Sequence, residues 1–349
     1  MLTTYKCPNC GGSMVFMPDT QDFKCEYCAS TFNEQELAKN AAKEQNAAYQ
    51  AEPGATADEN VNFFSCPNCG AQIVSTGTEM VANCYYCHSS MVQSNADSAE
   101  FNPDLIIPFK ISREKAKETF LQWVKEKKFV PSDFVSKKQI ENITGVYFPY
   151  WLGSFKTTAD ANYTAKNFRT WTSGSTEYTE TTEYDLHRKG SISLKNITKK
   201  ALKKADERVS ESVQPFMYED LIPYSKAYLL GFQAERRDVA SDELKEEFEQ
   251  DARRYTDDML LSTTTKYASV TKRNGNTNIT GRDMKYALLP CWVLTYKDKN
   301  GKIYPYTLNG QTGNACGELP VSKAKLVLHF LKLAVPIFLI ISAVEWFLL

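Results

Sequence analysis

The chain has 349 residues, of which 24% are charged and 42% hydrophobic. It is long enough for two or three domains and too polar to lie mainly inside a membrane. The charges are unevenly spread: residues 1–100 hold four lysines, no arginine and twelve acidic residues, a net charge of −8, whereas residues 101–349 carry +7. Affinity for a phosphate backbone comes largely from Lys and Arg, so the acidic first part argues against nucleic-acid binding there.

Eight of the ten cysteines follow one spacing that occurs twice. In each copy, a C-x₂-C pair followed by glycine lies fourteen residues before a second C-x₂-C pair. Two such pairs complete a closed tetrahedral site of four thiolates, which suits a structural Zn²⁺ ion. The sequence therefore predicts two tandem zinc ribbons, residues 1–33 and 64–93, with one Zn²⁺ each. The candidate metal ligands are Cys7, Cys10, Cys25, Cys28, Cys66, Cys69, Cys84 and Cys87.

The cysteine pairs allow other interpretations, which the sequence supports to different degrees. Iron in a rubredoxin-like site would use the same four thiolates, and the sequence does not separate it from zinc. Disulfides are disfavoured because no secretory signal precedes Cys7 and such pairs in reducing compartments more often hold metal. A thioredoxin-like redox pair would need a surrounding βαβ pattern. His88 directly follows Cys87, but the first copy has Ala29 there, so we expect His88 to be a surface residue.

Each cysteine module is too small to bury a core of its own, so metal binding should supply much of its folding free energy. Residues 34–63 join a helix-forming stretch to a connector that contains Pro53-Gly54, and residues 94–104 form a second linker. We therefore expect both modules to be mobile with respect to the main body.

Beyond the second linker, the pattern predicts an α+β domain over residues 105–325. A buried strand at 105–109 is followed by a helix that Ser112 caps and that carries apolar residues on one face. An aromatic strand at 146–152 leads into β-rich alternation, after which a polar helix is expected at 199–213.

Part of this pattern recurs later in the chain. Residues 220–224 echo the first strand, and residues 287–293 echo the aromatic strand, with a proline and a tryptophan at matching positions. Between them, a helix is expected from Ser241 to about Leu261. The recurrence favours an internal duplication with halves 105–215 and 216–325.

No catalytic constellation stands out. The three histidines, His88, His187 and His329, have no partner at ligand or catalytic spacing, and the chain has no H-E-x-x-H, G-x-S-x-G or Walker motif. Cys291 and Cys316 lack a nearby histidine that could activate them and are expected to be packed thiols. We predict no catalytic and no cofactor-binding residue; a ligand groove lined by the aromatic strands is the minority alternative.

The C-terminal stretch predicts the location of the protein. Residues 326–349 contain only two charged side chains, Lys332 and Glu345, and 24 helical residues span about 36 Å, enough to cross a hydrocarbon core of about 30 Å. Lys323, Lys325 and Lys332 lie on the N-terminal side, which predicts that side to be cytoplasmic. We expect a single-pass tail anchor in the cell membrane. A buried helix of a soluble domain is disfavoured because the apolar run covers all faces.

Three features of the sequence together resemble those of a known family. They are the paired cysteine modules, the two segments Pro149-Tyr150-Trp151 and Pro290-Cys291-Trp292, and the turn at 309–313. The chain resembles bacterial membrane proteins with TFIIB-type zinc ribbons, found mainly in Firmicutes. Some of these are encoded beside phage-shock-protein-A-like and flotillin-like (SPFH) proteins and are thought to help place them at the membrane. The resemblance implies protein partners of these kinds, and it transfers only the eight cysteine ligands. A helicase label attached to such chains does not transfer, because no ATPase motif is present.

These observations favour a membrane-anchored cytosolic adaptor or scaffold that binds proteins through its zinc ribbons and α+β domain, with a role in membrane stress as the resemblance implies. Two alternatives come from other classes: a membrane-tethered nucleic-acid-binding regulator, and an uncharacterised enzyme in which zinc is only structural. Neither the identity of the partner nor the oligomeric state follows from the sequence.

Overall fold

The computed structural model describes residues 6–40, 61–76, 84–94, 101–203 and 213–348. The chain divides into two compact units. Unit 1 contains residues 1–148, 204–236 and 288–349, and unit 2 contains residues 149–203 and 237–287. The first and last of the boundaries between the units lie within two long strands, β8 (Thr144–Ser173) and β12 (Ser269–Lys297). Both cysteine modules and the C-terminal helix belong to unit 1.

The first cysteine module forms a small antiparallel sheet in the order β1-β2-β3. Its strands are β1 (Met14–Met17), β2 (Asp22–Cys25) and β3 (Thr31–Phe32). Residues 34–40 after it are helical, and Leu37 in this helix is buried. The remainder of the predicted 34–63 spacer lies largely outside the described residues.

The second cysteine module belongs to the main sheet of unit 1. Its strands are β4 (Val61–Ser65), β5 (Gln72–Thr76) and β6 (Val92–Ser94). Strand β5 pairs antiparallel with β11 (Gln233–Glu235), which in turn pairs parallel with β8. Ala234 therefore lies opposite Val74 on one side and Tyr147 on the other. Our expectation of an independently mobile module is wrong, because this pairing joins the module to the main body by a backbone ladder.

Further short strands complete unit 1. The strand order is β10-β7-β12-β8-β11-β5-β4-β6, with β13 beside β12 and β14 beside β13. The additional strands are β7 (Leu105–Ile106), β10 (Ile222–Pro223), β13 (Ile303–Asn309) and β14 (Ala315–Gly317). Its helical segments are α2 (Arg113–Lys125), η2 (Asp133–Val135), α3 (Lys137–Ile140), η3 (Tyr218–Asp220) and η4 (Lys226–Leu229).

Aromatic side chains form the centre of this unit. The Phe109 ring stacks on Phe232 with 4.2 Å between ring centroids, and it meets Tyr147 and Trp292 edge-on. Helix α2 buries Ala116, Phe120 and Val124, which recur every four residues and so share one face, as the sequence predicts. The aromatic strands thus supply core contacts within unit 1.

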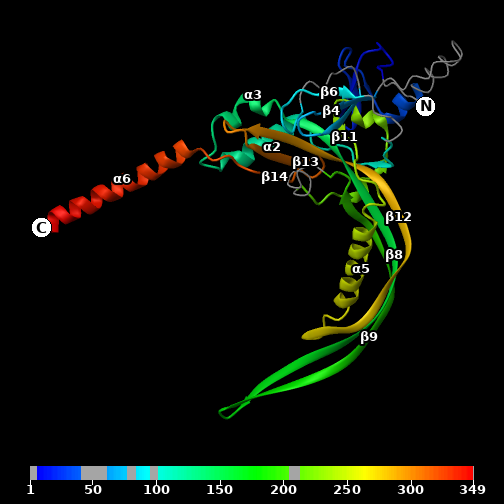
Figure 1. The fold of residues 1–349 in the computed structure, drawn as a ribbon, viewed down its shortest axis with the longest axis vertical. Helices are drawn as coiled ribbons and strands as arrows, with labels where there is room; N and C mark the ends of the chain where they lie inside the picture. The colour runs from blue at the N-terminus through cyan, green and yellow to red at the C-terminus, as the bar shows by residue number, and fades with distance from the viewer. Residues whose placement is uncertain (1–5, 41–60, 77–83, 95–100, 204–212, 349) are drawn as a thin grey trace. The chain divides into compact units, whose positions relative to one another are not determined.

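Unit 2 is a long antiparallel hairpin with a helix on it. Strands β8 and β9 (Thr176–Lys200) stay paired from Tyr150 opposite Lys200 to Ser173 opposite Thr176, and β12 pairs with the other edge of β8. Helix α5 (Lys245–Ser262) lies on the concave side of these bent strands (Figure 1). Small residues of β8 make room for it: Ala159, Ala161 and Ala165 are buried with Leu260 of the helix.

Two expected helix boundaries in this unit are wrong. Strand β9 continues through Lys200 where a helix was expected to begin, because Lys199 and Lys200 pair with Trp151 and Tyr150 across the hairpin. Residues 204–212 of that expected helix lie outside the described residues. Helix α5 begins at Lys245 rather than after Ser241, since residues 241–244 form a turn in which the Glu243 carboxylate accepts from the Ala240 N–H. The internal duplication stays a prediction.

The chain ends in helix α6 (Lys323–Leu348), drawn in red in Figure 1. Among the described residues, one helix, Lys323–Val344, is long and apolar enough to cross a membrane. None of its most apolar stretch is buried. A core helix of a soluble domain would bury one face, so this exposure is consistent with a single-pass anchor.

Candidate metal centres

The eight predicted ligands form two separate groups of four. In each group the Sγ atoms all lie within 4.8 Å of one another. Cys7 and Cys28 have their Sγ atoms 3.5 Å apart, as do Cys10 and Cys25. The matching pairs in the second group, Cys66 with Cys87 and Cys69 with Cys84, are 3.5 and 3.6 Å apart.

These distances fit a tetrahedral cation site and no disulfide. A disulfide brings the two sulfurs to about 2.05 Å. Zinc–sulfur bonds of about 2.3 Å set the edge of a regular tetrahedron at about 3.8 Å, close to the separations found. Four soft sulfur donors and no open position suit a structural Zn²⁺, and iron would accept the same ligands. When bound, such an ion would join the two turns of each module and stabilise its fold.

The first C-x₂-C pair of each module sits in one kind of turn. The Gly11 N–H donates to the Cys7 carbonyl at 2.8 Å, and the Gly70 N–H donates to the Cys66 carbonyl at 2.9 Å. Both glycines have a positive φ, 70° and 78°. This left-handed conformation is the physical reason for the glycine after each first pair, since other residues adopt it at a cost.

The second pair repeats this turn without glycine. The N–H of Ala29 donates to the Cys25 carbonyl, and the N–H of His88 donates to the Cys84 carbonyl. Ala29 and His88 have φ values of 59° and 60°. The His88 ring contacts Thr295, with Nε2 2.9 Å from the threonine Oγ1. His88 is exposed, as expected, and it occupies the turn position rather than a ligand position.

Hydrogen bonds prepare individual sulfurs to ionise. The side chain and the backbone N–H of Ser30 lower the pKa of Cys28 to about 6. Burial works against ionisation of Cys87, but hydrogen bonds from Asn68 and Ser89 outweigh it and lower the pKa of this thiol to about 6. Burial raises the pKa of Cys69 to about 11. A metal ion binding to either group would displace the protons that the remaining thiols retain.

The first group is attached to unit 1 through its sheet. The Phe16 N–H donates to the Leu230 carbonyl at 3.1 Å, and the Phe16 ring meets Tyr228 at 5.1 Å between centroids. Gln21 Nε2 donates to the Phe109 carbonyl at 2.8 Å. Cys10 and Cys28 of this group remain exposed. The expected mobility of this module is therefore also wrong, although its sulfurs lie near the surface.

The second group is more enclosed. Cys66, Cys84 and Cys87 are buried, and Ile303 of β13 packs against them. Between the last two cysteines, Tyr85 and Tyr86 lie beside the buried carboxylate of Glu235, and burial followed by this negative charge raises the pKa of both phenols. No local pattern around Glu235 or Ile303 indicated these contacts, because they join segments about 150 or more residues apart.

The remaining sequence candidates lie apart from both groups. Cys291 is fully buried in β12, where burial raises the pKa of its thiol, and Cys316 is half-buried in β14. His187 contacts the Asp160 carboxylate at 2.7 Å on the exposed part of the hairpin in unit 2. His329 lies on α6 with its ring 5.3 Å from that of Phe129.

Comparisons with known proteins give one similar chain to report. An uncharacterized protein of Bacillus subtilis (strain 168), YdjG, is 28% identical over 345 residues, which cover 99% of this chain and 98% of the relative. The likeness fits a Firmicutes-type protein. No family model matches the chain. No solved structure matches it either.

Proposed function

We propose that this protein is a membrane-anchored scaffold that binds other proteins on the cytoplasmic side. In this proposal the cysteine groups are zinc ribbons that stabilise unit 1, and α6 is the anchor. The protein partners are of the phage-shock-protein-A-like or SPFH kind that the resemblance suggests. The proposal rests on three features: two four-cysteine groups that could each hold a metal ion, an apolar helix with no buried residue in its most apolar stretch, and an aromatic surface on unit 2.

The position of the cysteine groups supports a structural role for the metal. A four-thiolate site offers no open coordination position at which a substrate could bind. The sheet pairing through β5 and β11 also makes the second ribbon part of the main body. The ribbons therefore hold the fold of unit 1, and partner binding is assigned mainly to the surface of unit 2.

The observation that carries the proposal is the end of the β8–β9 hairpin, residues 168–181, which we term the hairpin tip. Just before β12, the Ala268 N–H donates to Asn167 Oδ1 of β8 at 2.9 Å, and beyond this point the tip continues as the paired strands β8 and β9 (Figure 1). Phe168, Trp171 and Tyr178 on it are 53%, 45% and 47% exposed.

Such a tip has features of a protein-binding surface. An isolated two-stranded hairpin is only marginally stable in water, and exposed aromatic side chains gain free energy when a partner covers them. Trp171 stacks on Tyr178 across the strands with 5.7 Å between centroids, while Phe168 lies on the opposite face by strand alternation. Aromatic residues of this kind dominate binding at protein interfaces.

The test is a comparison of captured proteins. Full-length protein would be purified in mild detergent from its own cells as wild type, as Trp171→Ser/Tyr178→Ser, and as Tyr27→Ser. Tyr27 is the aromatic control on a different surface, because it lies on the first cysteine module and is 80% exposed, more than either tip residue. A photo-crosslinking residue at position 178 would identify what contacts the tip.

We expect the wild type and the Tyr27→Ser control to capture the same membrane-associated proteins, and the tip variant to lose them. The crosslinker should then join position 178 to one of those proteins. If every form captures the same set, the partner surface lies elsewhere. If no form captures any protein above background, the scaffold proposal is wrong.

A further inference from the structure

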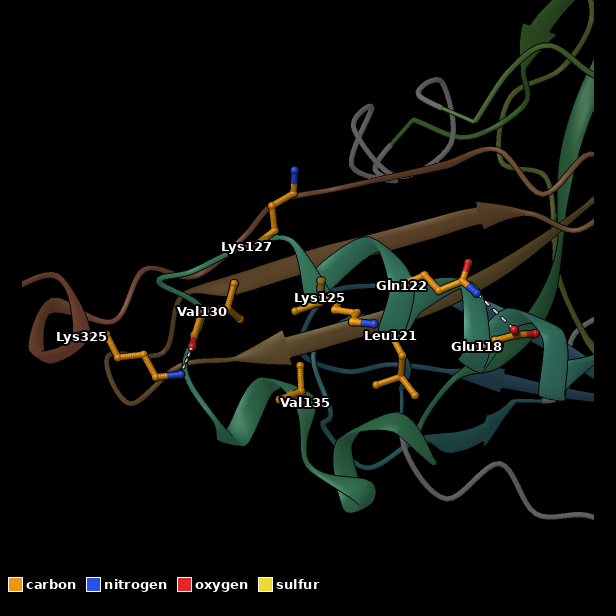
Figure 2. A pocket seen from close by; sticks show the side chains of 9 residues that line it. Glu118, Leu121, Gln122, Lys125, Lys127, Val130, Val135 and Lys325 are labelled. Atoms are coloured by element: carbon orange, nitrogen blue, oxygen red, sulfur yellow. Dashed lines mark hydrogen bonds between the residues drawn. The ribbon is translucent and has the colours of Figure 1, made fainter. Parts of the chain in front are cut away.

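An open pocket of about 450 Å³ lies in unit 1, where the chain enters α6 (Figure 2). Its apolar lining comes from Leu121 and Val124 of α2, together with Val130 and Val135 of the segment that follows. Lys125, Lys127 and Lys325 add their side chains to the same pocket. The pocket thus combines an apolar lining with parts of three lysine side chains.

Hydrogen bonds fix the start of α6 beside this pocket. The Ser322 N–H donates to the Phe129 carbonyl at 2.7 Å, and Lys325 Nζ donates to the Val130 carbonyl at 2.7 Å, the contact drawn in Figure 2. The first turns of α6 therefore lie next to the loop after α2. If α6 crosses a membrane, this loop and the pocket lie at the level of the lipid headgroups.

The charges around the pocket are mainly positive. The segment 125–128 holds three lysines and one glutamate, and residues 323–332 of α6 hold three lysines and no acidic residue. Within the part of the chain that the structure describes, Lys125 and Lys127 form no ion pair. The carboxylate in the lining, Glu118, is engaged by Lys115 at 2.8 Å and by Gln122 at 3.1 Å. The lysines are thus available to an anion.

We propose that this pocket binds one anionic phospholipid of the membrane that α6 crosses. The lipid phosphate would lie against Lys125 and Lys127, and the upper part of an acyl chain would cover the lining of Leu121 and Val130. Basic groups next to a membrane-crossing helix attract anionic lipids, and an ammonium–phosphate contact is a charge-assisted hydrogen bond. The inference rests on the proposed function, because it needs α6 in a membrane.

The experiment uses the full-length protein in detergent, titrated with phosphatidylglycerol or phosphatidylcholine and measured by native mass spectrometry. Wild type would be compared with Lys125→Gln/Lys127→Gln. The matched control is Lys195→Gln/Lys285→Gln, which removes the same charge from two exposed lysines of unit 2. Leu121→Ser tests the apolar lining without any charge change, and Leu121 is exposed enough to be replaced without loss of the fold. Free inorganic phosphate serves as a competitor.

We expect the wild type and the control to bind phosphatidylglycerol, and the Lys125/Lys127 variant to bind it about tenfold more weakly. Leu121→Ser should weaken binding severalfold, and millimolar phosphate should displace little lipid. Equal binding of the two lipids by the wild type would overturn the inference. So would a loss of binding in the control equal to that in the pocket variant, or unchanged binding in Leu121→Ser, because either result indicates diffuse charge attraction.

Alkaline carbonate extraction of cell membranes separates this inference from the proposed function. If the wild type is extracted into the soluble fraction, α6 is not an anchor, and the scaffold proposal and the lipid site fail together. If it resists extraction but shows no preference for phosphatidylglycerol, only the lipid site fails.

Discussion

The His88 ring lies within hydrogen-bond distance of Thr295, a residue 207 positions further along the chain. His88 directly follows the last cysteine of the second group, and Thr295 lies in β12 of the main sheet. The Thr295 Oγ1 also donates to the Tyr85 carbonyl, between Cys84 and Cys87. The turn that presents these two candidate metal ligands is therefore held by the main sheet as well as by its own backbone bonds.

Loss of the second metal site should cost more stability than loss of the first. Cys66→Ser/Cys69→Ser removes two ligands from a buried group that shares a sheet with β11, so we expect the free energy of unfolding of unit 1 to fall by about 4 kcal/mol or more. Cys7→Ser/Cys10→Ser should cost less, because its group is half exposed. Urea unfolding followed by tryptophan fluorescence measures both.

Metal analysis of the same proteins gives the control. The wild type should contain two metal ions per chain and each double variant one, with elemental analysis separating zinc from iron. Two ions retained in either variant would show that the removed cysteines are not ligands.

The contact between α5 and the long hairpin should be sensitive to single substitutions. Phe248 and Phe155 are both fully buried, with 6.1 Å between their ring centroids. Phe248→Ala should lower the free energy of unfolding of unit 2 by about 3–5 kcal/mol, since it leaves a cavity. Tyr255→Ala on the exposed side of the same helix should cost less than about 1 kcal/mol. If thermal unfolding shows that Phe248→Ala and Tyr255→Ala lower the free energy of unfolding equally, this packing is contradicted.

Close packing at Gly153 allows a test in which a side chain is enlarged instead of shortened. A Cβ at Gly153 would come within 2.6 Å of Phe155 and 2.9 Å of Phe248. Gly153→Ala should therefore destabilise unit 2 by about 1–3 kcal/mol through overpacking. Gly190→Ala on β9 has nothing within 4 Å of the new methyl group and is the matched control. A neutral Gly153→Ala variant would show that this crowding does not exist in solution.

The acid dependence of stability should include a contribution from Asp220. The Lys110 ammonium pairs with this carboxylate and holds its pKa below the usual range. A depressed pKa stabilises the fold above the pKa of the unfolded state, near 3.9, and the gain disappears as the pH falls through the lower folded value. At pH 7 the free energy of unfolding of the wild type should exceed that of Asp220→Asn by about 1 kcal/mol. The difference is modest because the side chains of Asp220 and Lys110 are both partly exposed.

The measurement for Asp220 is the difference in urea unfolding free energy between the two proteins at pH 7 and near pH 3. Taking a difference cancels the effect of acid on the metal groups. A difference that stays constant between the two pH values would refute the ion pair.

Membrane insertion should depend on the apolar character of α6. Leu339→Arg/Ile340→Arg places two charges within the apolar stretch of the span, where each costs up to about 3.5 kcal/mol on insertion scales. We expect this variant to appear in the soluble fraction after carbonate extraction, whereas Lys323→Arg/Lys332→Arg, which keeps all charges, stays with the membrane. Retention of both variants would argue against a spanning helix.

The sequence by itself predicted the two groups of four cysteines, the apolar tail and the buried face of α2. Each of these depends on residues close together in the chain. Two C-x₂-C turns position their own sulfurs, a run of apolar residues defines a span, and a four-residue period defines a helix face. The eight cysteines were therefore found without any knowledge of the fold.

Only the tertiary structure decided what the modules touch. The pairing of Val74 with Ala234 joins segments 160 residues apart, and the pocket beside α6 brings Val130 to Lys325. The C-terminal end of β9 also depends on a distant partner. Lys200 pairs with Tyr150 in the hairpin, although the residues that follow Lys200 favour a helix. Such contacts gain their free energy from partners distant in sequence, which no local spacing or periodicity can encode.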